Sequence, residues 1–122
     1  MATFSKQKLS GSTNGRGIAV AATSTVGTTI HATTTSATTI DELWLYAANI
    51  HSSAVTLTIE LGGVTVTSDL IQQSIAATPS GLVLVCAGLI LTGTGSAALT
   101  VSAFAGTASK IEIFGFVNRI TA

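Results

Sequence analysis

The chain contains few residues whose types and spacing could support metal binding. His31 and His51 are its only histidines, and they form neither an H-x-H nor an H-x-x-x-H pair. A bound metal ion would need at least a third ligand close by. Outside such a motif a histidine more often packs into the fold or meets solvent. We therefore interpret both histidines as structural or solvated residues.

The acidic residues do not suggest a catalytic carboxylate pair. Asp41 and Glu42 are adjacent, so on a strand their side chains would point to opposite faces. Glu60 and Glu112 occupy outward positions of alternating segments, where we expect them to be solvated or paired with a basic side chain. The basic partners expected for such pairs are Lys110 and Arg119.

No nucleophile lies in a catalytic motif. Ser96 follows Gly-Thr-Gly rather than standing in G-x-S-x-G, and no helical pattern follows it to build a nucleophile elbow. Cys86 is flanked by apolar residues and lacks a basic partner, so we expect a buried, unreactive thiol. The glycines around Arg16 lack the Lys-Ser/Thr ending of a phosphate loop. We therefore expect no catalytic, cofactor-binding or metal-binding residues and no enzymatic activity.

The aromatic residues are too few to predict a carbohydrate-binding face. With one tryptophan and one tyrosine in the chain, we favour packing in the core. Phe114 and Phe116 are two positions apart and would share one face of the last strand. The complete aromatic set is Phe4, Trp44, Tyr46, Phe104, Phe114 and Phe116.

Composition limits the class of protein. The 122 residues carry no net charge, and 8% of them are charged while 47% are hydrophobic; an ordinary soluble domain has roughly 25% charged residues. This length fits one domain, and the lack of basic charge argues against direct nucleic-acid binding. A single cysteine excludes an intrachain disulfide. The longest apolar run, residues 81–91, is much shorter than the roughly 20 residues of a membrane helix, so we expect no membrane partner.

Alternating apolar and polar residues recur along the chain and predict short β-strands. Residues 40–50 form the strongest central strand, with two largely apolar faces that we expect to be buried on both sides of its middle; a helix is the alternative there. Residues 55–61 alternate cleanly, and Gly62-Gly63 then predicts a tight hairpin to a return strand at 64–67. Residues 68–77 fit either a strand at 70–75 or a single helical turn. Residues 82–86 and 89–92 are predicted as a buried strand pair with a bend at Gly88. The remaining predicted strands are 18–22 and 28–33, paired as a hairpin, 98–104, and 110–120.

About eight or nine strands at this spacing are typical of a sandwich or barrel. We predict an all-β fold: a single-domain antiparallel β-sandwich or jelly-roll-like barrel, spanning residues 17–122, with an extended N-terminal arm at residues 1–16. The arm contains Lys6, Lys8 and Arg16 and no acidic residue. We expect it to be flexible and to order on a partner, where these three basic side chains would contact acidic groups.

Several segments resemble small virion proteins of tailed bacteriophages. They are FSKQKLSGSTNGRGI at residues 4–18, GLVLV at 81–85, GLIL at 88–91 and GFVNRIT at 115–121. The resemblance covers most of the chain and implies a capsid decoration (cement) protein, or else a tail or fibre component. Proteins of this kind are commonly rich in β-structure and often trimeric.

The resemblance implies a non-enzymatic structural protein on the capsid surface of the virion, which binds and stabilises the assembled head. Its expected partners are the major capsid protein and further copies of itself, as a homotrimer. The low charge content favours burial in an assembly, because a neutral, apolar surface is poorly solvated at high concentration. The alternative is a tail- or fibre-associated β-module that binds the host surface.

Overall fold

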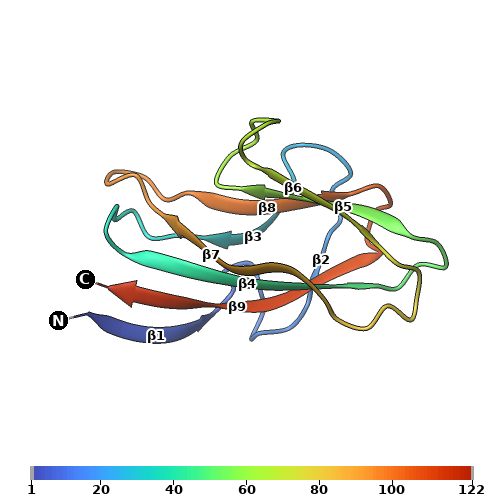
Figure 1. Ribbon diagram of the computed structural model, residues 1–122, viewed down its shortest axis with the longest axis horizontal. Helices are drawn as coiled ribbons and strands as arrows, with labels where there is room; N and C mark the ends of the chain where they lie inside the picture. Colours follow the sequence, from blue (N-terminus) through green and yellow to red (C-terminus); the bar gives the residue numbers. More distant parts are fainter. Residues whose placement is uncertain (1, 122) are drawn as a thin grey trace.

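The computed structural model describes residues 2–121 as an all-β protein (Figure 1). This range contains no helix, and hence none that is long and apolar enough to cross a membrane. The predicted all-β class is confirmed. The strands are β1 (Thr3–Lys8), β2 (Ile18–Ala19), β3 (Thr28–Ala32), β4 (Ile40–Asn49), β5 (Val55–Leu61), β6 (Leu70–Ile75), β7 (Val83–Thr92), β8 (Thr100–Ala105) and β9 (Ile111–Thr121).

The strands form two antiparallel sheets, which Figure 1 shows as two layers. Sheet A has the order β1-β9-β4-β7, and β2 also pairs with β9; sheet B has the order β3-β8-β5-β6. The predicted hairpin between residues 18–22 and 28–33 is wrong, because β2 pairs with β9 and β3 pairs with β8. The polar residues between them connect the two sheets instead of turning back within one.

The second half of the chain pairs with the first half in reverse order. β2 pairs with β9, β3 with β8, β4 with β7 and β5 with β6. The pairings β4–β9 and β5–β8 then join these ribbons into the two sheets. β1 lies outside this nested set and pairs with β9 at the edge of sheet A. As a result Thr3 lies opposite Thr121, and the start of β1 is beside the end of β9 (Figure 1).

Aliphatic side chains fill the space between the sheets. The burial expected on both faces of β4 is found on only one of them: Leu43, Leu45 and Ala47 are buried, whereas Trp44 and Tyr46 are only half-buried. The expected aromatic core is wrong, since no aromatic side chain in residues 2–121 is fully buried. Both faces of this strand are apolar, so its pattern does not say which face meets the core. The core consists of Leu9, Ile18, Val20, Ile30, Leu43, Leu45, Ala47, Val55, Leu57, Ile59, Ile75, Cys86, Val101, Ala103, Ala105, Ile111, Ile113 and Val117.

The turn after β5 is wider than the tight hairpin predicted at Gly62-Gly63. The Leu61 N–H donates to the Asp69 carbonyl at 2.8 Å, and the Asp69 carboxylate accepts the Thr65 N–H at 3.0 Å. Residues 64–67 therefore lie in the turn and are not a strand. The return strand is β6, one of the two alternatives left open for this segment.

The described part of the predicted arm is structured. β1 pairs with β9 along its whole length. Leu9 is 1% exposed and belongs to the core, and the Gly11 N–H donates to the Ile30 carbonyl at 2.9 Å. Residues 9–11 are thus part of the folded body, because Leu9 fills a core position. Met1 and Ala122, at the ends of the predicted arm and domain, lie outside the described residues.

Gly115 marks a very close approach of β9 to β4. Its φ is +154°, and an added Cβ would lie 2.0 Å from the Trp44 carbonyl oxygen. We expect Gly115→Ala to lower the free energy of unfolding by at least about 3 kcal/mol, because backbone strain and overpacking add. Urea unfolding of the purified variant measures this loss.

Gly81→Ala is the matched control. Gly81 has a φ of +65°, but an added Cβ there would meet nothing within 4 Å. Gly81→Ala should therefore lower the free energy of unfolding through backbone strain alone, by about 1–2 kcal/mol. Equal losses for the two variants would contradict the close approach at Gly115.

Candidate functional site

The three basic residues predicted to bind a partner are exposed. Lys6 and Lys8 lie on β1, and Arg16 lies in the loop that follows. The Lys6 ammonium lies 4.5 Å from the centroid of the Phe116 ring, a cation–π contact that ties β1 to β9. None of the three forms a salt bridge within the described residues.

An aromatic row crosses the outer face of sheet A. The Trp44 and Phe116 rings are stacked, with centroids 6.3 Å apart and planes at 12°. The Trp44 indole N–H donates to Glu42 Oε1 at 2.8 Å, and the Asn118 amide donates to the same oxygen at 3.0 Å. These two bonds lower the pKa of Glu42. The row therefore combines flat apolar rings with a fixed carboxylate.

The apolar surface continues from this row to β7. Leu84 lies opposite Tyr46 and Ile90 lies opposite Glu42, so both side chains share the outer face of sheet A. They are 45% and 60% exposed, and Leu82 just before the strand is 62% exposed. We call this surface, made of Trp44, Tyr46, Leu82, Leu84, Ile90, Phe114 and Phe116, the apolar face.

β7 is also the far edge strand of sheet A. The two strands predicted at 82–86 and 89–92 are one continuous strand here, and its register against β4 shifts at Val85 and at Gly88. Its expected burial is wrong, because most of its side chains are half-buried or exposed. An edge strand offers unpaired backbone donors and acceptors to another chain. β7 carries no charged residue that would discourage such pairing.

A buried carboxylate, ion-paired with Arg119 in its own sheet, connects the two sheets through a hydrogen bond with His31. His31 on β3 and Asp41 on β4 are each 1% exposed, and His31 Nε2 lies 2.7 Å from Asp41 Oδ2. Arg119 holds the same carboxylate with Nε at 2.8 Å and Nη2 at 2.9 Å. The Ser10 N–H donates to His31 Nδ1 at 3.0 Å. Since Nδ1 accepts, the neutral imidazole carries its proton on Nε2 and donates it to Asp41.

These contacts make Asp41, Arg119 and His31 a structural cluster. Burial alone would raise the pKa of Asp41, but the hydrogen bonds from Arg119 and His31 outweigh it and hold that pKa below its usual value. The hydrogen bond with Asp41 also raises the pKa of Arg119. His31 is therefore structural and not solvated. The available sequence signal was that Asp41 shares the strand parity of buried Leu43.

Glu60 is the second buried carboxylate, and its predicted outward, solvated position is wrong. It is 1% exposed and accepts hydrogen bonds from the Ser102 hydroxyl at 2.6 Å, the Gly27 N–H at 2.8 Å and the Thr25 hydroxyl. Burial would raise its pKa, but these three bonds outweigh that effect and lower it. The loop before β3 covers this part of sheet B, which the alternation of β5 could not reveal.

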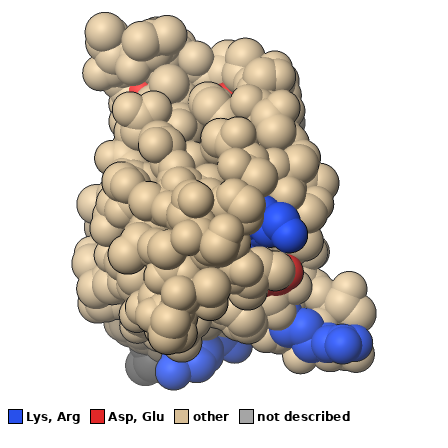
Figure 2. Space-filling model, turned by 90° about the vertical axis from the view of Figure 1, so that its right-hand side faces the viewer, with Lys and Arg blue, Asp and Glu red and all other residues tan. Residues whose placement is uncertain are grey.

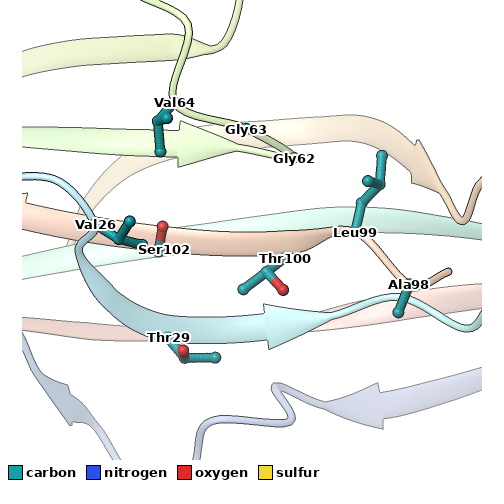
Figure 3. Close-up of a pocket in the computed structure, with 9 residues that line it drawn as sticks. All are labelled: Val26, Thr29, Gly62, Gly63, Val64, Ala98, Leu99, Thr100 and Ser102. Atoms are coloured by element: carbon teal, nitrogen blue, oxygen red, sulfur yellow. The ribbon is translucent and has the colours of Figure 1, made fainter.

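Two pockets have volumes of about 420 Å³ each, one lined by residues of sheet B and the other by residues of sheet A and the segment before β7. Figure 3 shows the first, whose lining includes the hydroxyl-bearing Thr29, Thr100 and Ser102 and the apolar Val26 and Leu99. No charged side chain lines it. The second adjoins the apolar face, with Leu82 and Phe114 in its wall. Neither lining contains an acid, base or metal ligand that could carry out chemistry.

The remaining sequence candidates stay apart. Within residues 2–121 no three His, Cys, Asp or Glu side chains gather where they could hold a metal ion. Cys86 is 2% exposed, and burial raises the pKa of its thiol, which confirms the predicted buried cysteine. Asp41 and Glu42 lie on opposite faces of β4, as predicted.

No protein-family model, curated protein or solved structure matches this chain. We therefore assign the apolar face as the candidate functional surface from the structure alone. Sequence reasoning missed it because the aromatic residues were assigned to the core. The only signal was that both faces of β4 are apolar while one face suffices for a core.

The Asp41 ion pair makes a testable contribution to stability. We expect Asp41→Asn to lower the free energy of unfolding at pH 7 by about 3 kcal/mol, because it removes the buried carboxylate and leaves the half-buried Arg119 guanidinium without its partner. The folded-state pKa of Asp41 lies below its unfolded value, so its contribution is present above the unfolded pKa and is lost as pH falls through the folded one. The difference in the free energy of unfolding between the wild type and Asp41→Asn should therefore narrow as pH falls from about 5 to about 2. Urea unfolding across this pH range measures it.

Glu112→Gln is the control, because the Glu112 carboxylate has no hydrogen-bond partner among the described residues. It should change stability by less than about 0.5 kcal/mol. A constant gap between the wild type and Asp41→Asn at all pH values would contradict the assigned role.

Proposed function

We propose that this chain is a non-enzymatic structural protein of a bacteriophage virion, a capsid decoration protein that binds and stabilises the assembled head. Its partners on the capsid surface are the major capsid protein and other copies of itself. The observation that carries the proposal is the apolar face together with the uncharged edge of β7, where Leu84 and Ile90 are 45% and 60% exposed.

This surface suits burial against protein. Charged residues make up only 8% of the chain, and the end-on view in Figure 2 is mostly uncharged apart from basic and acidic groups, mainly in its lower part. Large contiguous apolar patches on a small domain mark interaction sites. Aromatic side chains are enriched in the centres of protein interfaces, and Trp44 and Phe116 lie in the middle of this face. A homotrimer, which the phage resemblance suggests, would cover part of it.

The strand order supports a jelly roll as the finer description of the fold. A jelly roll contains eight strands in two sheets, and β2 to β9 pair in nested order from β2–β9 inward to β5–β6. This architecture occurs in viral capsid proteins and in lectins. It is compatible with the proposal, although a fold alone does not assign a function.

The polar clusters support a structural role. The Asp41 carboxylate accepts hydrogen bonds from His31 and Arg119, and the Glu60 carboxylate accepts them from the loop at residues 25–27. Among the described residues no buried side-chain nitrogen or oxygen lacks a hydrogen-bond partner. The two buried carboxylates are thus engaged in joining strands and loops.

Stabilisation of the head would follow from mass action. A protein that binds the assembled shell and not its free subunits stabilises the shell, as a ligand stabilises the state it prefers. An oligomer that spans neighbouring subunits also gains avidity, so weak contacts for each copy suffice. Apolar contacts of this kind depend weakly on salt.

A tail- or fibre-associated module that binds the host surface is the second candidate. The observation that favours it is the stacked pair of Trp44 and Phe116 beside Glu42 and Asn118. Flat rings next to hydrogen-bonding groups can also stack on a sugar.

Purified particles distinguish the two functions. If the protein decorates the head, it is present in many copies, and particles without it should release their genome at a lower temperature than complete particles, at unchanged host attachment. A fluorescent DNA dye measures release during heating. Equal thermal stability with loss of attachment would overturn the head assignment and favour the tail module.

A charge placed on the apolar face should prevent binding. We expect Ile90→Lys to fold normally but to bind stripped capsids at least about tenfold more weakly, because an unpaired ammonium would be buried in the interface. Co-sedimentation with the capsids measures binding, and circular dichroism checks the fold. Val66→Lys is the control, because Val66 is 76% exposed in the turn after β5. Equal binding by both variants would exclude the apolar face as the contact.

A further inference from the structure

We infer that β1 is an exchangeable strand: in the oligomer, Thr3–Lys8 of one copy pairs with β9 of a second copy in the register that the single chain shows. This inference rests on the self-association that forms part of the proposed function. It assigns the β9 edge as the acceptor site and the β1 segment of another copy as its occupant.

β1 is separable from the rest of the fold. It lies outside the nested pairing of β2 to β9. Five of its six side chains are exposed and the other is half-buried, so the strand contributes no side chain to the core. What holds it is backbone pairing with β9 and the Lys6 contact on the Phe116 ring. Both interactions can be made equally well with another copy of β9.

The segment after β1 is fixed in place. Leu9 is 1% exposed in the core, the Ala32 N–H donates to the Ser10 hydroxyl at 2.7 Å, and the Gly11 N–H donates to the Ile30 carbonyl. The strand can therefore pivot between residues 8 and 9 while the core stays intact. Six extended residues reach about 20 Å, enough to cross to a neighbouring copy in contact.

The acceptor edge needs an occupant. If β1 swings away, β9 exposes unpaired backbone groups from Phe116 to Thr121, and an open edge is a template for another strand. The one segment shown to fit is Thr3–Lys8, and a second copy supplies an identical segment. Exchange in a closed symmetric oligomer keeps every β1–β9 contact and adds a link between subunits.

Cysteines placed on separate chains test this exchange. Phe4 lies opposite Ile120, and opposite residues of an antiparallel pair have Cα atoms about 4.5–5.5 Å apart, within reach of a disulfide. We would co-express a Phe4→Cys chain with an Ile120→Cys chain, both carrying Cys86→Ser, and oxidise the purified full-length oligomer. Exchange predicts that a disulfide-linked dimer of the two chains forms on a non-reducing gel, well above the level given by the control pair, while chains that assemble with their own kind stay unlinked.

The control pair shares Ile120. Ile40 on β4 also lies opposite Ile120, from the other side of β9, and this pairing is inside the sheet. Ile40→Cys and Ile120→Cys on separate chains should give only background dimer, whereas both on one chain should give an intrachain disulfide. This arrangement measures random collisions near residue 120.

The outcomes separate this inference from the proposed function. If Phe4→Cys and Ile120→Cys crosslink only when they are on the same chain, and light scattering still shows an oligomer, exchange is overturned while self-association stands. A monomer, both in solution and on the particle, would overturn self-association and exchange together. Dimer at the level of the Ile40 control would also overturn exchange.

Discussion

The pairing of β4 with β9 is the constraint on which the rest of the structure depends. Every residue of β4 pairs with β9, in the middle of sheet A. This register sets Asp41 opposite Arg119 on the inner face and Trp44 opposite Phe116 on the outer face. Because side chains alternate along a strand, a shift by one residue would exchange the aliphatic core for the aromatic row.

The two buried carboxylates extend this order beyond sheet A. Asp41 reaches His31 on the opposite sheet, and Glu60 fastens the loop at residues 25–27 to sheet B. A buried carboxylate is costly unless hydrogen bonds compensate for it, so each fixes the position of its donors. The segment after β1 joins this network through Ser10. Loops that would otherwise move are thereby held to the sheets, which suits a rigid body that bridges other proteins.

The strand positions could be predicted from the sequence because period-2 alternation acts locally. Residues 40–50 and 110–120 match β4 and β9 closely. The partners of the strands could not be predicted, since nothing local distinguishes a hairpin from a crossing between sheets at residues 20–27. Glu60 was misplaced for the same reason: a loop distant in sequence buries an outward position.

The candidate surface was harder to predict than the fold. A strand with two apolar faces gives no sign of which face is covered, so the aromatic residues were placed inside. The structure fills the core with aliphatic residues and leaves Trp44 and Phe116 outside. Lys6 and Lys8, predicted as features of a loose arm, lie on a paired strand. Their role depends on whether β1 pairs with β9 of its own chain or of a second copy, and the local sequence does not encode this choice.

The two edges of sheet A differ in a way that gives them different roles. β1 is short, and its two lysines discourage the addition of a further strand. β7 has ten residues, no charge and exposed leucine and isoleucine side chains. Its register shifts interrupt a regular ladder, which weakens simple strand addition but leaves the apolar side chains available. A partner that packs on side chains beside β7, rather than one that extends the sheet, therefore fits this edge best.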